Sequence, residues 1–215
     1  MSDMPGSPRS RGLPPNRLEA FSDGVFSIAS TLLVLEIAVP LAASEDLLGA
    51  LAAQWPAYLA YVTSFLTIGW VWVGHAAITS HMARANALFL RLNLVLLMAV
   101  AFLPFPTRLM AEYLGERAPE QVAVVFYGLV LLLIAALLGA LWRYAIGSAE
   151  IRRSDLSDEE LATLSGKSPR GMLLLLLSTV LGVLLPNLAV FCFLLVSAYL
   201  VIPFRDVAGA VRHRS

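Results

Sequence analysis

Three polar residues open the first apolar stretch of the sequence. Residues 17–37 read RLEAFSDGVFSIASTLLVLEI, so Arg17, Glu19 and Asp23 lie at the start of an otherwise apolar helix. Burying a carboxylate at the centre of a bilayer costs about 2.5 kcal/mol or more, and the cost is lower near the interface. Asp23 could therefore be an ordinary residue of a helix N-terminus, where the helix dipole favours negative charge. The clustering of several polar side chains on one helix favours a functional network instead.

A second pattern follows on the same predicted helix. Ile28, Thr31 and Leu35 are spaced so that they share one helical face, and Leu32 flanks this face. Apolar residues at this spacing are typical of contact with lipid or with a protein core. A face with one hydroxyl among large apolar side chains could also line a narrow pore that closes by excluding water. Spacing alone leaves both alternatives open.

The chain contains few residues that could support catalysis, metal binding or nucleic-acid binding. Of the three histidines, His81 is expected in a loop and His213 in a tail. Cys192 is the one cysteine, so no internal disulfide forms and no metal-type Cys/His spacing exists. The formal net charge is zero, which provides no basic field for nucleic acid. We therefore expect neither an enzyme nor a cofactor-binding protein, and no nucleic-acid partner.

The composition places these residues in a membrane. Hydrophobic residues make up 59% of the 215 residues, charged residues make up 14%, and the mean hydropathy is +0.77. Soluble domains contain about 45–50% apolar and about 25% charged residues. A core of this size cannot hide such an excess, so lipid must cover part of the surface. The sequence predicts an all-α integral membrane protein.

Six apolar stretches are candidates for membrane-spanning helices, each of which needs roughly 20 mostly apolar residues. They are residues 18–40, 55–79, 86–110, 120–146, 171–186 and 188–203. The last two come from one apolar run that Pro186-Asn187 interrupts. A single helix through that run would extend about 50 Å, beyond a hydrocarbon core of about 30 Å, so we prefer two short helices. Together the six form one predicted transmembrane domain, residues 17–205.

The loop charges predict the orientation of these spans. With six spans and both termini in the cytoplasm, 13 of the 15 Lys and Arg residues fall inside, and Arg108 and Arg117 fall outside. The positive-inside rule expects this distribution, whereas five spans would place the basic C-terminal residues outside. We therefore predict a multi-pass protein of the cell membrane. Residues 1–16 are expected to form a disordered cytoplasmic tail, and residues 206–215 a basic cytoplasmic tail.

The polar start of the first helix resembles a known signature. Arg17-x-x-x-Phe21-Ser22-Asp23-Gly24, followed by VFSIASTLLVLEI, is similar to the signature of the transmembrane protein 175 family of potassium channels. Three further motifs follow in the family's order: Trp72-Val73-Gly74-His75, Arg91-Leu92-Asn93-Leu94 and Leu103-Pro104-Phe105-Pro106-Thr107. The resemblance covers about residues 17–110, and beyond it the chain matches only in hydropathy and helix count. One departure is Ala76, which stands where the family often has a second histidine.

The resemblance implies a homotetramer of six-helix subunits around a central pore that the first helix lines. Carried over by position, Ile28, Thr31 and Leu35 form the constriction with Leu32 beside them, and Thr31 holds potassium transiently. A structural network is implied for Arg17, Phe21, Ser22, Asp23, Trp72, His75 and Asn93. In this network Asp23 is ionised beside Arg17 and accepts hydrogen bonds from Ser22, an indole or an imidazole. Such contacts would set which face of the first helix points at the pore.

The functional prediction is a potassium-preferring cation channel that conducts passively past an apolar constriction. The alternative is a proton-coupled membrane transporter in which Asp23 and His75 titrate. Potassium is then the permeant ion rather than a cofactor. The expected partners are other copies of the chain and membrane lipid.

Overall fold

The computed structural model describes residues 14–38, 46–115, 119–153 and 169–201. The predicted C-terminal tail lies outside these ranges, as does the predicted N-terminal tail up to residue 13. Residues 15 and 16 already belong to the first helix. The described residues form helices and contain no strand, apart from one isolated bridge between Met82 and Arg152.

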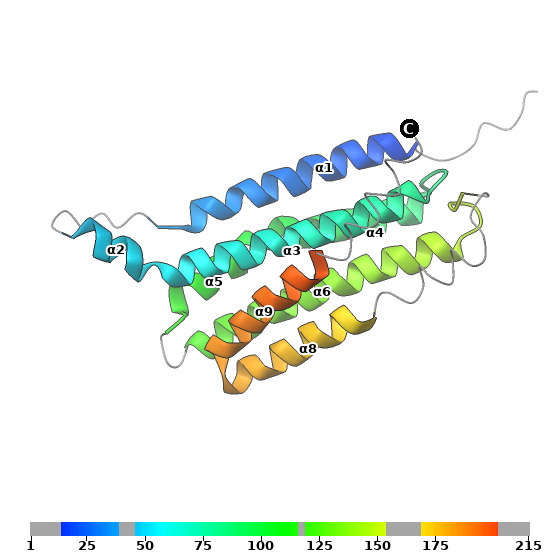
Figure 1. The fold of residues 1–215 in the computed structure, drawn as a ribbon. Helices are drawn as coiled ribbons and strands as arrows, with labels where there is room; N and C mark the ends of the chain where they lie inside the picture. Colours follow the sequence, from blue (N-terminus) through cyan, green and yellow to red (C-terminus); the bar gives the residue numbers. More distant parts are fainter. Residues whose placement is uncertain (1–13, 39–45, 116–118, 154–168, 202–215) are drawn as a thin grey trace, which may run out of the picture.

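The helices lie along one long axis (Figure 1). In chain order they are α1 (Pro15–Leu32), the 3₁₀ turn η1 (Leu33–Glu36), α2 (Leu47–Ala53), α3 (Trp55–Ser80), α4 (Ala87–Phe102), α5 (Pro104–Tyr113), α6 (Pro119–Gly147), α8 (Pro169–Leu184) and α9 (Pro186–Val201). Four helical segments are long and apolar enough to cross a membrane: Pro15–Glu36, Trp55–Ser80, Ala87–Tyr113 and Pro119–Gly147. The chain is a multi-pass, all-helical membrane protein.

The first and third predicted helices are each divided in the structure. The first narrows into η1 after Leu32 and ends at Glu36, short of the predicted residue 40. The third is broken at Leu103, because Pro104 has no N–H to continue the ladder of backbone hydrogen bonds. Its start is capped by Asn86, whose side chain accepts a hydrogen bond of 3.0 Å from the Phe89 N–H.

The apolar run at the C-terminal side contains two helices of 16 residues, α8 and α9. The second begins at Pro186, two residues before the predicted start, because the first position of a helix tolerates a missing N–H. Each helix extends about 24 Å, which is shorter than a hydrocarbon core of about 30 Å. The short helix α2, which the sequence analysis did not predict, follows Asp46, whose carboxylate accepts a 2.9 Å hydrogen bond from Gly49 N.

Figure 1 shows α1 along one side of the bundle and α8 along the opposite side. The α1 helix packs on α3 and α4, whereas α8 packs on α6 and α9. Buried hydroxyl groups connect the helices that lie between α1 and α8. Ser64 of α3 lies 2.7 Å from the Thr107 hydroxyl of α5 and 2.9 Å from the Tyr127 hydroxyl of α6, and Thr67 lies 2.9 Å from Ser197 of α9. This cluster holds α3 at the centre of the bundle.

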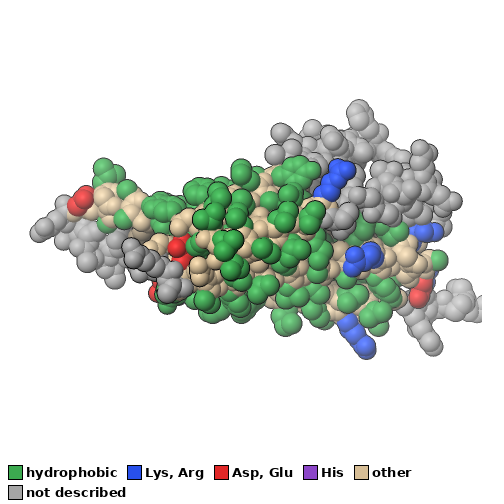
Figure 2. Space-filling view, turned by 90° about the horizontal axis from the view of Figure 1, so that it is seen from below, with side chains coloured by type: hydrophobic (Ala, Val, Ile, Leu, Met, Phe, Trp, Pro, Cys, Tyr) green, Lys and Arg blue, Asp and Glu red, His purple; other side chains and the backbone are tan. Residues whose placement is uncertain are grey.

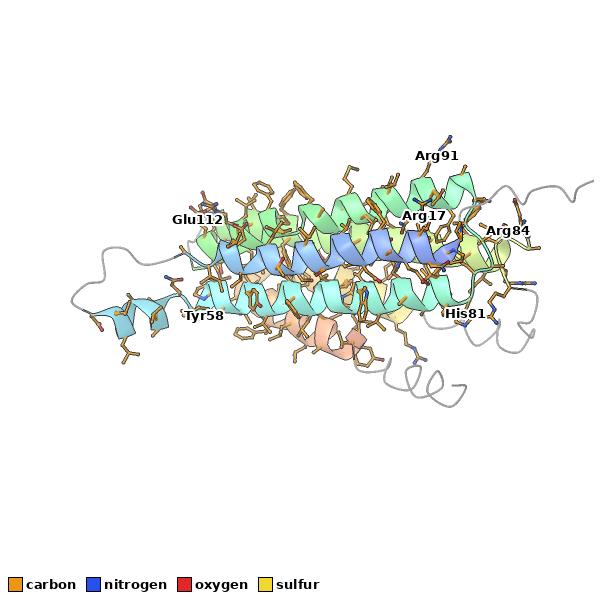
Figure 3. All side chains as sticks on the ribbon, turned by 90° about the horizontal axis from the view of Figure 1, so that it is seen from above. Arg17, Tyr58, His81, Arg84, Arg91 and Glu112 are labelled. Atoms are coloured by element: carbon orange, nitrogen blue, oxygen red, sulfur yellow. The ribbon has the colours of Figure 1, made fainter. Side chains whose placement is uncertain are left out.

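The two ends of the bundle differ in charge. Figure 3 places Arg17, Arg84 and Arg91 at one end, called here the arginine end, and Glu112 and Tyr58 at the opposite end. In the space-filling view, blue side chains gather toward the arginine end and green side chains cover the middle (Figure 2). A wide apolar band between polar ends is the surface that a bilayer requires.

Candidate functional site: the first helix and its polar anchor

The α1 helix has one buried face and one exposed face. Its buried residues are Leu18, Ser22, Phe26 and Ala29, and Leu33 of η1 continues the same line. Their spacing of three and four residues makes one stripe, which packs on α3 and α4. The orientation of α1 about its own axis is therefore set by what this stripe contacts.

The opposite face holds the predicted pore residues. Ile28 is 61% exposed, Leu35 is 73% exposed, and Thr31 and Leu32 are exposed as well. The Thr31 hydroxyl donates a 2.9 Å hydrogen bond to the Ile28 carbonyl oxygen of its own helix. Its only proton is thereby used within the helix, and its oxygen keeps lone pairs that can face a cation.

A buried chain of hydrogen bonds connects α1 to its neighbours. Asn93 of α4 donates from Nδ2 to Ser22 Oγ at 3.1 Å. The amide oxygen of Asn93 therefore faces His75 of α3, whose Nε2 donates to it at 2.8 Å. All three side chains are buried. The Phe26 ring packs edge-on against the His75 ring, with centroids 5.5 Å apart. We call Ser22, Asn93 and His75 the polar anchor.

Asp23 makes a separate contact at the surface of the subunit. Trp72 Nε1 of α3 donates to Asp23 Oδ1 at 2.8 Å, and the Trp72 side chain remains 45% exposed. Because its acceptor is a carboxylate, this bond is charge-assisted. Asp23 follows Ser22 of the polar anchor in the chain, and its bond to Trp72 is a further contact between α1 and α3.

Two residues of the predicted network take no part in it. Arg17 is exposed, and its side chain makes no hydrogen bond or ion pair with any described residue. The expected pairing of Arg17 with Asp23 is thus absent from the described ranges, and Ser22 bonds Asn93 rather than Asp23. Phe21 points outward and is exposed. Both residues lie on the same side of α1 as Ile28.

The end of η1 makes an ionic contact that the sequence analysis missed. Arg108 of α5 lies 3.9 Å from Glu36 and 3.9 Å from Glu112. Arg108 is largely exposed, so each pair contributes about 0–1 kcal/mol at most. The spacing of Arg108 and Glu112, four residues apart on one helix, was a visible signal for one of the two pairs. Nothing local in the sequence indicated Glu36.

Within the described ranges, no group of three or more His, Cys, Asp and Glu side chains is arranged to hold a metal ion. The chemistry that the site does support is electrostatic and steric. It consists of a helix held on one face by its neighbours, with a mainly apolar outer face that also carries the exposed hydroxyls of Ser27 and Thr31.

Comparison with known proteins identifies the family of this chain. Residues 17–104 match the family model described as the endosomal/lysosomal potassium channel TMEM175. The crystal structure of a lysosomal potassium-selective channel TMEM175 homologue from Chamaesiphon minutus is 37% identical, covers 88% of this chain and 97% of that one, and superimposes with a TM-score of 0.79. The chain belongs to the TMEM175 family. Every residue of the polar anchor, together with Asp23 and Trp72, lies inside the matched segment.

Curated TMEM175 relatives differ in the ion that their names give. A protein of Streptomyces collinus named a potassium channel is 51% identical over 127 residues, which are 59% of this chain and 62% of that protein. The chicken protein named an endosomal/lysosomal proton channel is 33% identical over 147 residues, which are 64% of this chain and 29% of that protein. The chain thus spans less than two thirds of either relative.

Proposed function

We propose that this chain is the subunit of a cation channel whose pore is lined by the exposed face of α1. The observation that carries the proposal is the division of α1 into two faces. One face is fixed to α3 and α4 by packing and by the polar anchor, and the other presents Ile28, Thr31 and Leu35, which no other helix of the described ranges covers. Its membership of the TMEM175 family supports a pore at that face rather than simple lipid contact.

The proposed pore face constricts the ion pathway without binding the ion tightly. Ile28 and Leu35 lie about 10 Å apart along the helix, and Thr31 lies between them. Large apolar side chains exclude water from a narrow path and hold a cation weakly, which permits fast passage. The free lone pairs of Thr31 are the place where a partly dehydrated potassium ion would pause, and Leu32 would flank the path.

The proposed assembly is a homotetramer of six-span subunits with α1 around the axis. In this arrangement α8 and α9 cross the membrane as a short pair, and both termini lie on the cytoplasmic side with the arginine end. The gathering of Arg17, Arg84 and Arg91 at that end supports this orientation. A closed ring of four copies would also shield the exposed face of α1 from lipid.

The polar anchor has a positioning role in this proposal. Neighbouring residues of an α-helix differ in direction by about 100°, so a rotation of α1 by about that angle in one direction would replace Thr31 in the pore by Leu32. The hydrogen bond from Asn93 to Ser22 opposes that rotation. Asp23 and His75 bond different partners and not each other. We therefore prefer passive conduction to the proton-coupled alternative that needs these two residues to act together.

A flux assay tests the proposal. The purified chain is reconstituted in liposomes, and ion flux is driven first by a potassium gradient and then by a proton gradient. Passive potassium conduction predicts a reversal potential that follows the potassium gradient and ignores pH, whereas a potential that follows pH would establish proton coupling or proton conduction.

Variants test the pore assignment in the same assay. Ile28→Asn and Leu35→Asn are expected to raise flux or lower selectivity, because each replaces an apolar constriction by an amide. Leu177→Asn on α8 is the matched control, since Leu177 is 56% exposed and lies on the opposite side of the bundle. Unchanged flux in folded, assembled Ile28→Asn and Leu35→Asn protein would overturn the assignment.

A further inference from the structure

An apolar groove of about 360 Å³ opens between α6 and α8, away from α1. It is lined by Gln121, Val122, Val125, Phe126, Leu129 and Val183. Its volume lies within the range of about 300–1,000 Å³ that is usual for sites of small molecules. Apart from Gln121 the lining side chains are aliphatic or aromatic, so the groove can bind only an apolar group along most of its length.

The walls of the groove are formed by two helices in close contact. A Cβ atom at Gly182 of α8 would stand 3.1 Å from Val124 of α6, and one at Gly128 of α6 would stand 2.5 Å from the Thr179 hydroxyl of α8. Small residues let two membrane helices approach closely. The larger side chains beside this contact, such as Val125 and Val183, then leave a channel along the seam.

The position of the groove along the bundle matches the headgroup end of a lipid acyl chain. Gln121 stands in the first turn of α6, and Leu129 lies about 12 Å further along the helix. The α6 helix begins at the end of the bundle opposite to the arginine end (Figure 1). In the orientation of the proposed function, the single amide of the groove is at the outer headgroup level, and the aliphatic residues lie below it in the hydrocarbon.

The surroundings of the groove leave it open to lipid. Figure 1 places α1 and α8 on opposite sides of the bundle. If α1 surrounds the pore, as the proposed function requires, the seam between α6 and α8 faces the membrane. A helix about 10 Å thick would fill on the order of 900 Å³ over the same 12 Å, which is more than the groove holds. A single extended chain is the occupant that fits.

We propose that this groove binds one acyl chain of an outer-leaflet phospholipid, with its ester region beside the Gln121 amide. The inference rests on the proposed function for the orientation of the chain and for the exposure of the groove to lipid. Phe126 in the groove wall also packs against Phe105, with ring centroids 6.2 Å apart, directly beside the break between α4 and α5. The bound chain would thus contact Phe126, whose ring packs against Phe105 beside this break.

Photo-labelling tests the site. The protein is reconstituted with phosphatidylglycerol that carries a diazirine in the middle of one acyl chain, illuminated, digested and analysed by mass spectrometry. Labels are expected to concentrate on the lining residues of α6 and α8. Leu129→Trp, which fills the groove, is expected to reduce this label at least fivefold. Leu133→Trp is the matched control, because Leu133 lies one turn away outside the groove with 52% exposure against 55% for Leu129.

Three outcomes would overturn the proposal. They are an even spread of label over the apolar surface, an undiminished label in Leu129→Trp, and disulfide cross-linking between copies through Leu129→Cys in a Cys192→Ala background. The last result would show that a second subunit covers the groove. Ion flux is recorded on the same vesicles. Normal flux with unspecific labelling would contradict the groove alone, and absent flux in the unsubstituted protein would contradict the proposed channel alone.

Discussion

Removing the amide at the centre of the polar anchor should loosen α1. In Asn93→Ala, His75 Nε2–H and Ser22 Oγ lose their partners inside the bundle. Each buried polar group left without a partner costs about 1–3 kcal/mol in soluble proteins. Hydrogen bonds between membrane helices contribute less in double-mutant cycles, about 0.6 kcal/mol on average and about 1.7 at most. The His75 bond is lost together with the Ser22 bond, so we expect Asn93→Ala to destabilise the subunit by about 1–3 kcal/mol.

A double-mutant cycle isolates the bond to α1. Ser22→Ala, Asn93→Ala and the double variant are unfolded by sodium dodecyl sulfate in mixed micelles, and the free energies of unfolding are compared. The coupling between Ser22 and Asn93 is expected to be about 0.5–1.5 kcal/mol. Met98→Ala, an exposed position on α4, controls for the loss of side-chain volume on that helix.

The same variants distinguish an anchor from mere packing. If the bond fixes the rotation of α1, Ser22→Ala should lower ion selectivity in liposomes while the assembled fraction stays unchanged. Additive free energies, within about 0.3 kcal/mol, together with unaltered selectivity, would refute the positioning role.

Three further predictions concern single contacts. Trp72→Phe keeps an aromatic ring, though a smaller one, and removes the N–H bound to Asp23, so unfolding stability should fall by about 1 kcal/mol in the same titration; an unchanged midpoint would mean that the bond contributes nothing. Tyr127→Phe removes one partner of Ser64, which keeps its second, so the loss should stay near 0.5 kcal/mol, and a loss above about 3 would show that Tyr127 does more than join helices. Thr31→Val preserves side-chain volume but removes the hydroxyl, so preference for potassium over sodium, read from bi-ionic reversal potentials, should decrease; an unchanged ratio would exclude Thr31 from ion selection.

The sequence predicted the long helices because their signal is local. An apolar stretch of sufficient length is visible within one segment, and so is an interruption such as Pro186-Asn187, which indicated two helices although α9 begins at Pro186 rather than at the predicted residue 188. Helix ends were less predictable. Where α1 tightens into η1, each backbone hydrogen bond spans three residues instead of four. Neither Leu33 nor Glu36 is a residue type that indicates this change.

The candidate site was predictable only where a known sequence motif linked residues on different helices. Periodicity shows that Ile28, Thr31 and Leu35 share a face, but the same pattern is found on helices that face lipid. The partnership of Ser22 with Asn93 joins residues 71 positions apart, and no local rule indicates it. The hydroxyl cluster around Ser64 was missed for the same reason. Small polar residues in membrane helices are common, and only the packing of four helices brings these together.

Silver block of a cysteine at the pore face tests the central claim most directly. Thr31→Cys is prepared in a Cys192→Ala background, with Leu177→Cys as the control on α8, and potassium flux is measured before and after addition of Ag⁺, a monovalent cation that binds thiolate. If the exposed face of α1 lines the pore, Ag⁺ should abolish flux through Thr31→Cys and leave Leu177→Cys unaffected. Full flux through Thr31→Cys after Ag⁺, in protein that conducts before it, would contradict the assignment of this face to the pore.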